Sequence, residues 1–69
     1  MKISARNVFK GKVADVRPGR LNTEVIIEIP GGLQVVAMIS KESEETLQLK
    51  KGKTAYAIIK SSSVMVAVD

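Results

Sequence analysis

The sequence contains no cysteine and no histidine, and these two absences exclude several kinds of chemistry. Without cysteine the chain has no disulfide and no thiolate ligand for a metal ion. Without histidine it lacks the commonest transition-metal ligand and the usual general base of enzymes. The one nucleophile scheme left is a Ser–Lys pair, but Lys60 and Ser61 are adjacent, so on a strand their side chains diverge. We therefore expect a protein that is not an enzyme.

Aromatic side chains are almost as scarce, because Phe9 and Tyr56 are the only two. Proteins that bind single-stranded nucleic acid combine a basic groove with aromatic platforms on which bases stack. The formal net charge of +4 favours anionic partners, including nucleic acid, phosphate groups and small oxyanions, and it also fits a role in solubility alone. The scarcity of aromatic residues therefore argues against a protein that binds nucleic acid by base stacking. It leaves binding to a nucleic-acid backbone through basic residues as an alternative function.

Long hydrophobic runs are absent as well. None approaches the length of a membrane-spanning helix, and the N-terminus lacks the apolar segment of a signal peptide. We expect a soluble, cytoplasmic protein without a membrane partner. Its 69 residues fit a single domain, residues 1–69, which buries only about 60% of the surface that the unfolded chain exposes. Domains this small often need additional stabilisation from a disulfide, a bound metal or a partner subunit. Because the chain has no cysteine and no histidine, oligomerisation is the candidate that remains.

Short apolar runs separated by glycine and proline make up most of the chain. They predict five strands, at residues 8–16, 23–29, 33–39, 55–59 and 64–68. Pro18-Gly19 marks a turn, and Pro30-Gly31-Gly32 closes a hairpin between the second and third strands.

One short helix is expected in the segment Ser40–Leu47. Ser40 can cap it by accepting from an orphan backbone N–H, and three glutamates follow in the early turns, where the helix dipole favours anions. Lys50, Lys51 and Gly52 fit its end. The order of elements predicts an all-β protein with one short helix: an OB-like five-stranded Greek-key barrel with the helix between strands three and four. A small SH3-like barrel is the alternative.

Several predicted strands are apolar on both faces. Residues 25–27 and 35–39 are uninterrupted apolar runs, and 64–68 contains no polar residue. An ordinary half-solvated strand alternates apolar and polar residues. Because a small barrel has only one interior, the second apolar face should meet another subunit, or edge strands should pair between protomers. We expect a homo-oligomer.

Hydroxyl groups lie beside a cation near both ends of the chain. Ser4 and Arg6 share one face of a strand, and the small Ala5 between them leaves room for close backbone approach. Lys60 and Ser61 form the other pair, and neither segment contains a carboxylate. A fully ionised tetrahedral oxyanion offers only acceptors and needs a cage of donors, of which charged ones contribute about 1.5–3 kcal/mol each.

These two segments also have a structural interpretation, and from the residues alone the signal for an anion site is weak. Ser4 and Asn7 can cap the start of the first strand, and Ser61-Ser62-Ser63 can form a polar turn. Serine and lysine residues near chain ends are usually solvated, so the residues alone do not decide between the two interpretations.

Taken in order and spacing, these segments resemble the molbindins, small Mop-like, TOBE-type proteins that bind molybdate or a molybdenum pterin. The resemblance lies in Ile3-Ser4-Ala5-Arg6-Asn7, Lys10-Gly11-Lys12-Val13, Glu24-Val25, Gly31-Gly32, Ala37-Met38-Ile39-Ser40 and Lys60-Ser61-Ser62-Ser63-Val64-Met65. It covers essentially the whole chain. The Ser-Ala-Arg-Asn start combined with the Lys-Ser pair near the end is its specific part.

The resemblance implies binding without chemistry. It implies an OB-like barrel that assembles as a hexamer, a trimer of dimers, and holds molybdate or tungstate between subunits for molybdenum storage or homeostasis. The ligand would be the bare oxyanion or a molybdopterin-related form, with no covalent cofactor and no side chain bound directly to a metal cation. A basic OB-type module that contacts a nucleic-acid backbone is the alternative function.

The resemblance also assigns site residues. Those expected to hold the oxyanion are Ser4, Ala5, Arg6, Lys60 and Ser61. Ser40 would complete the cage from a neighbouring subunit, serve only as a helix cap, or do both, since helix N-termini bind anions. Those expected at a second type of site, near the three-fold axes, are Gly19, Arg20 and Asn22.

Overall fold

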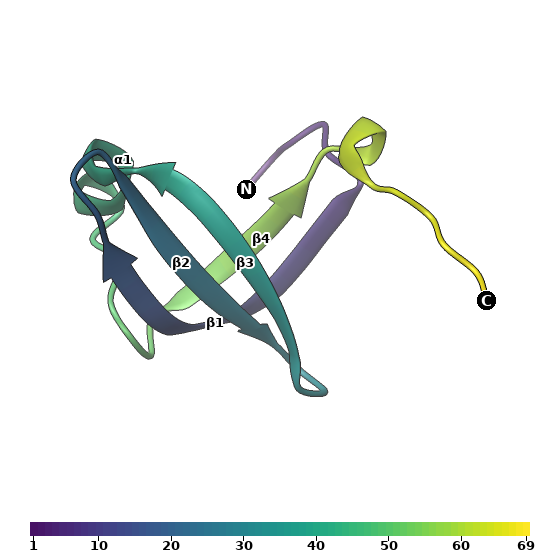
Figure 1. The fold of residues 1–69 in the computed structure, drawn as a ribbon, viewed down its shortest axis with the longest axis horizontal. Helices are drawn as coiled ribbons and strands as arrows, with labels where there is room; N and C mark the ends of the chain where they lie inside the picture. Colours follow the sequence, from purple (N-terminus) through teal and green to yellow (C-terminus); the bar gives the residue numbers. More distant parts are fainter.

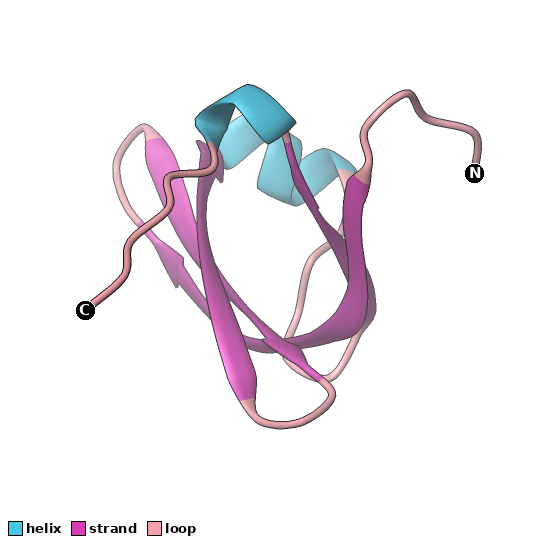
Figure 2. Ribbon diagram, turned by 90° about the vertical axis from the view of Figure 1, so that its right-hand side faces the viewer, coloured by secondary structure: helices cyan, strands magenta, loops and turns pink.

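The computed structural model describes residues 1–69 as one curled antiparallel sheet with a short helix (Figure 1 and Figure 2). The elements are β1 (Asn7–Pro18), β2 (Asn22–Ile29), β3 (Leu33–Ser40), α1 (Lys41–Thr46), β4 (Thr54–Ile59) and the 3₁₀ turn η1 (Ser61–Ser63). The four strands lie in the order β3-β2-β1-β4. Because β3 and β4 are the two edges and do not pair, the sheet is an open half-barrel.

The long strand β1 pairs with two neighbours in succession. Its first half pairs with β4, from Asn7 opposite Ile59 to Lys12, and its second half pairs with β2, starting with Lys12 opposite Glu28. At the changeover, a Cβ on the buried Gly11 would lie 2.3 Å from the carbonyl oxygen of Glu28. Glycine therefore permits the close approach through which β1 serves both partners.

The predicted hairpin between β2 and β3 is confirmed. All eight residues of each strand are paired in one uninterrupted register. In the turn, Gly31 and Gly32 have φ angles of 102° and 91°, which favour glycine, and the Gly32 N–H donates to the Ile29 carbonyl at 3.1 Å.

The helix α1 lies between β3 and β4, as predicted. Ser40 caps it, because its Oγ accepts from the Ser43 N–H at 3.0 Å. The buried Thr23 of β2 donates from its Oγ1 to Glu44 Oε1 at 3.2 Å. These bonds hold α1 at the end of the sheet where β2 begins. No helix of the structure has the length and apolar character needed to cross a membrane.

The end of α1 differs from the prediction. The helix ends at Thr46, so Lys50–Gly52 form no part of it. Gln48 adopts a positive φ of 52°, and the ammonium of Lys53 donates to the Leu47 carbonyl at 2.6 Å. The positively charged donor to a carbonyl at the end of the helix is therefore Lys53, which follows the turn after α1.

The buried core of a single chain is small. Its fully buried apolar side chains are Val13, Val25, Ile27 and Ala57. Many large apolar side chains of β3, β4 and the two chain ends are exposed. The outer apolar faces expected from the sequence are therefore present, and nothing within the chain covers them.

The predicted fifth strand, Val64–Val68, is absent. These residues form an exposed segment that leaves the sheet after η1 (Figure 1). The only backbone hydrogen bond that involves them runs from the Val64 N–H to the Ser61 carbonyl. The five-stranded barrel is therefore wrong for the single chain, because an apolar run becomes a strand only where it meets an edge. The mostly-β class with one short helix is confirmed.

Candidate functional site

Two segments that are far apart in the sequence meet at one corner of the sheet. Asn7, the first residue of β1, lies opposite Ile59, the last residue of β4, and Asn7 Nδ2 donates to the Ile59 carbonyl at 3.2 Å. Residues 4–6 immediately precede this pair, and residues 60–61 immediately follow it. Figure 1 accordingly shows the N-terminal segment and η1 at the same end of the sheet. Antiparallel pairing thus brings the two segments that contain the five residues assigned to the oxyanion by the resemblance to the same corner.

This corner, called the donor corner below, contains residues 4–6 and 60–61 and is rich in hydrogen-bond donors that have no acceptor within the chain. Ser4, Arg6, Lys60 and Ser61 are all exposed, and Ala5 is half-buried. Neither cation forms an ion pair, and neither hydroxyl forms a hydrogen bond within the chain. The backbone N–H groups of residues 4–6 also donate to no backbone acceptor. The corner can therefore offer charged, hydroxyl and amide donors to one anion.

The one-turn helix η1 sets the backbone after β4. Lys60 is extended, with φ −61° and ψ 130°, and its carbonyl accepts from the Ser63 N–H at 2.9 Å. The N–H groups of Ser61 and Ser62 have no backbone acceptor. The polar turn that the sequence offered as a structural alternative is present, and it adds free donors to the corner. Of the two proposed strand caps, Asn7 binds across to β4, whereas the Ser4 hydroxyl forms no bond.

Ser40 lies at the other end of the sheet. It is opposite Asn22 in the β2–β3 register, and α1, which it caps, lies at the upper left of Figure 1, whereas η1 lies at the upper right. The Gly19 N–H donates to the Asn22 carbonyl at 2.7 Å, and Arg20 is an exposed residue of the same turn. The structure therefore groups Ser40 with the residues assigned to the second site and separates it from Ser4 and Lys60. Within one chain Ser40 cannot complete the first cage.

Two carboxylates near the end of β1 and the start of β2, those of Asp15 and Glu24, form ion pairs with Arg17, a cation outside the donor corner. Arg17 donates from Nε to Asp15 Oδ2 at 2.9 Å and from Nη1 to Glu24 Oε1 at 3.3 Å. The pKa of Asp15 is lowered, first by the hydrogen bond from Arg17 and then by the Val16 backbone N–H, and the pKa of Arg17 is raised by Asp15. Sequence reasoning missed this cluster, although Asp-x-Arg on a strand places both side chains on one face.

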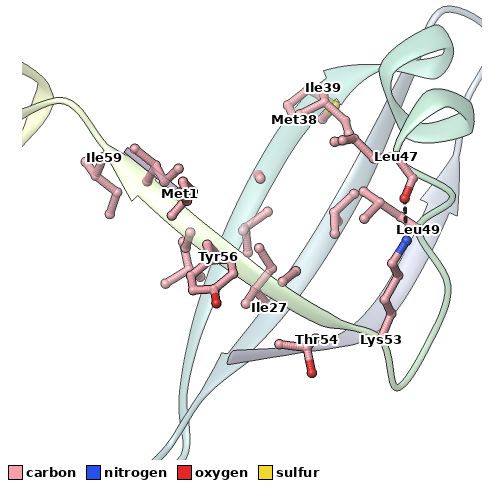
Figure 3. A pocket seen from close by; sticks show the side chains of 17 residues that line it. Met1, Ile27, Met38, Ile39, Leu47, Leu49, Lys53, Thr54, Tyr56 and Ile59 are labelled. Carbon is pink, nitrogen blue, oxygen red and sulfur yellow. Dashed lines mark hydrogen bonds between the residues drawn. The ribbon is translucent and has the colours of Figure 1, made fainter. Parts of the chain in front are cut away.

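An apolar trough of about 730 Å³ opens between β3 and β4. Figure 3 shows side chains from both edge strands, among them Met38 and Tyr56, lining it together with Leu47, while Lys53 lies at one end and donates to the Leu47 carbonyl. Apart from Lys53 and Thr54, its lining is hydrophobic. Such a surface suits a protein segment and does not suit a doubly charged oxyanion.

Comparison with known proteins shows similarity over nearly the entire chain. A family model described as the TOBE domain matches residues 3–66. A probable molybdenum-pterin-binding protein of Haemophilus influenzae is 49% identical over 69 residues, which is 100% of each chain. The matched range includes both Ser4–Arg6 and Lys60–Ser61.

Solved structures give the same picture. An apo form of MopII from Clostridium pasteurianum is 42% identical, with a TM-score of 0.93 over 97% of this chain and 100% of that one. The cytoplasmic molybdate-binding protein ModG, solved with molybdate bound, is 38% identical, with a TM-score of 0.90 over 94% of this chain and 46% of that one. The half-barrel described above is therefore the fold of those proteins as well.

Proposed function

Because the chain belongs to the TOBE domain family, as a molbindin, we propose that it binds molybdate and tungstate at subunit interfaces. The physiological role we propose is storage or homeostasis of molybdenum in the cytoplasm. The protein performs no reaction on the anion; it captures and releases it reversibly.

One observation carries this proposal: the corner formed by the start of β1 and the end of β4 collects donors without acceptors. Arg6 and Lys60 have no carboxylate partner, and Ser4 and Ser61 have hydroxyls that bond to nothing in the chain. Molybdate and tungstate are tetrahedral dianions with four acceptor oxygens, so they match a set of this kind. They are fully ionised at neutral pH, and a site for them has no need of histidine or cysteine.

The distribution of the remaining residues fits sites shared between subunits. Ser4, Ala5, Arg6, Lys60 and Ser61 form one half of the proposed cage, and Ser40 of a neighbouring subunit would supply the other. The end of the sheet that holds Ser40 also holds Gly19, Arg20 and Asn22, which we propose for a second type of site near the three-fold axes of a hexamer.

The bare oxyanion is the ligand that this corner favours over a pterin. None of the five donor-corner residues is aromatic, and stacking on aromatic rings is how proteins commonly hold flat heterocycles. Since a ligand that binds only the folded assembly stabilises it by RT ln(1 + [L]/Kd), oxyanion at 100 times Kd should add about 2.7 kcal/mol.

Isothermal titration calorimetry of the purified protein with molybdate, tungstate and sulfate tests the proposal. Sulfate is the matched control, because it is also a tetrahedral dianion but smaller. Heat with molybdate and tungstate and none with sulfate supports an oxyanion site of the proposed size. Silence with all three anions, together with salt-sensitive binding to an oligonucleotide, would replace it with the nucleic-acid backbone function.

A further inference from the structure

A second group of cations, outside the donor corner, lies in the segment between α1 and β4. It surrounds a hollow of about 650 Å³, called the lysine hollow below, whose lining residues are Gln48, Lys50, Lys51, Gly52 and Lys53. Neither an apolar side chain nor a carboxylate belongs to this lining. The lysine hollow therefore presents polar groups, most of them cationic, to a ligand.

The backbone of the lysine hollow is held by a tight turn. The Lys53 N–H donates to the Lys50 carbonyl at 3.1 Å, and Gly52 has a φ of 91°. Because Lys51 has no positive φ, the turn is of type II, which favours glycine at its third position. Its Gly52 N–H donates to the Val13 carbonyl at 2.8 Å, and the Val13 N–H donates to the Lys53 carbonyl at 2.9 Å. The turn is thus fastened to β1, and its lysines project from a fixed frame.

Two of the three lysines have no partner within the chain. The ammonium of Lys53 is held by the carbonyls of Leu47 and Gln48. Lys50 and Lys51 are exposed, and their ammonium groups form no ion pair and no hydrogen bond. The backbone N–H groups of the same two residues donate to no backbone acceptor. Two consecutive residues therefore offer two charged and two amide donors.

The carboxylate of Asp15 does not neutralise these donors. Its pKa is lowered first by the hydrogen bond from Arg17, and the charge of Lys51 lowers it further. One oxygen of Asp15 accepts from Arg17 Nε and the other from the Val16 N–H, both at 2.9 Å. Asp15 therefore belongs to Arg17, and Lys51 stays without an ion-pair partner.

We propose that the lysine hollow binds a compact anion with two linked phosphate groups, of the class of inorganic pyrophosphate. Its volume lies within the range of about 300–1,000 Å³ that is typical of small-molecule sites, so it has room for more than one tetrahedral group. Ammonium groups and free backbone N–H groups are ligands that proteins use for phosphate. Because no aromatic or apolar side chain lines the hollow, recognition rests on the phosphates. Free pyrophosphate and the diphosphate group of a nucleotide share this chemistry.

The lysine hollow is separate from the donor corner. It precedes Thr54, the first residue of β4, whereas the donor corner follows Ile59, the last residue of that strand (Figure 1). Six residues of extended strand span about 20 Å, so one small anion does not contact both. The inference therefore concerns a second ligand and does not rest on the proposed function.

An amide NMR titration of the full chain with inorganic pyrophosphate tests the location, at fixed ionic strength because salt screens exposed charges. We expect saturable shifts at Lys50, Lys51 and Gly52. Shifts at the donor corner alone, or unsaturable shifts near every lysine, would overturn the proposal. Adenosine diphosphate is the second titrant, and whichever of the two binds more tightly identifies the source of the diphosphate. An oligonucleotide that shifts these amides when neither diphosphate does would assign the hollow to nucleic acid instead.

Two double variants of equal charge test the residues. Lys50→Ala/Lys51→Ala removes two exposed lysines of the hollow, and Lys10→Ala/Lys41→Ala removes two exposed lysines elsewhere. Loss of two charged donors predicts pyrophosphate affinity at least about 10-fold weaker in the first variant, with little change in the control and the fold of both confirmed by circular dichroism. Equal loss in both variants would mean attraction to net charge alone and would overturn the site.

Calorimetry with molybdate and pyrophosphate separates this inference from the proposed function. Lys50→Ala/Lys51→Ala should keep molybdate binding and lose pyrophosphate binding, and Lys60→Ala should do the reverse. Pyrophosphate binding without molybdate binding would refute only the proposed function, and molybdate binding without pyrophosphate binding would refute only the lysine hollow. Loss of both ligands in Lys60→Ala would place pyrophosphate at the donor corner and overturn the inference.

Discussion

Replacing Gly11 with alanine tests the feature on which the whole arrangement depends. Gly11 lies where β1 leaves β4 and begins to pair with β2. This double pairing sets Asn7 opposite Ile59 and thereby creates the donor corner. Adding one methyl group at this position opposes the strand approach without changing charge or polarity.

The size of the effect follows from the contacts of the added methyl. The Cβ would lie 2.3 Å from the Glu28 carbonyl oxygen, and 3.0 Å from both the Glu28 carbonyl carbon and Ile29 Cδ1. The nearest atoms belong to the backbone of β2, so rotation of a side chain cannot relieve the closest contact. Overpacking that shifts backbone costs about 1–3 kcal/mol, and each kcal/mol lowers the Tm of a domain this size by about 4–8 °C.

Thermal unfolding followed by circular dichroism at a fixed protein concentration measures the loss. Ile29→Val provides the matched control, because it removes the Cδ1 atom and leaves the Glu28 carbonyl in place. We expect Gly11→Ala to be destabilised in either background. A Gly11→Ala protein as stable as the original, or one fully rescued by Ile29→Val, would show that the backbone contact is not what requires glycine.

Three further predictions concern the donors and the ion pair. Lys60→Ala should weaken molybdate binding, measured by calorimetry, by about 1.5–3 kcal/mol, which is the contribution of one charged hydrogen bond, and should leave the Tm unchanged. The control variant Lys50→Ala, which replaces another exposed lysine, should bind molybdate normally. Equal molybdate affinities in the two variants would show that Lys60 is not part of the site. Ser40→Ala should lower stability by about 1 kcal/mol and Ser40→Gly by only a few tenths if the cap alone matters; reduced oxyanion affinity in both variants would identify Ser40 as a ligand. The pKa of Asp15 is below its usual 3.8 because Arg17 donates a hydrogen bond to it. The stability that this ion pair contributes is therefore present above pH 3.8 and is lost as the pH falls through the lower folded-state pKa. Asp15→Asn should lose less stability than the original protein between about pH 5 and 3, and an identical dependence of stability on pH in the two proteins contradicts the ion pair.

Features encoded by neighbouring residues could be predicted from the sequence. Ser40 followed by glutamates specifies a helix start through groups within one turn, and Gly31-Gly32 supplies positive φ angles that few other residues adopt. Both predictions hold because every interacting atom lies within a few residues. The helix end was wrong for the opposite reason: its cation, Lys53, comes from beyond the following turn.

Features that depend on a partner could be predicted only in part. The apolar run at 64–68 satisfies every local criterion for a strand, yet pairing is a property of two segments, and no free edge of its own chain receives it. The grouping of Ser4–Arg6 with Lys60–Ser61 likewise depends on the register of β1 with β4. Sequence chemistry indicated that the two segments shared a ligand type, and only the register from Asn7 opposite Ile59 places them side by side.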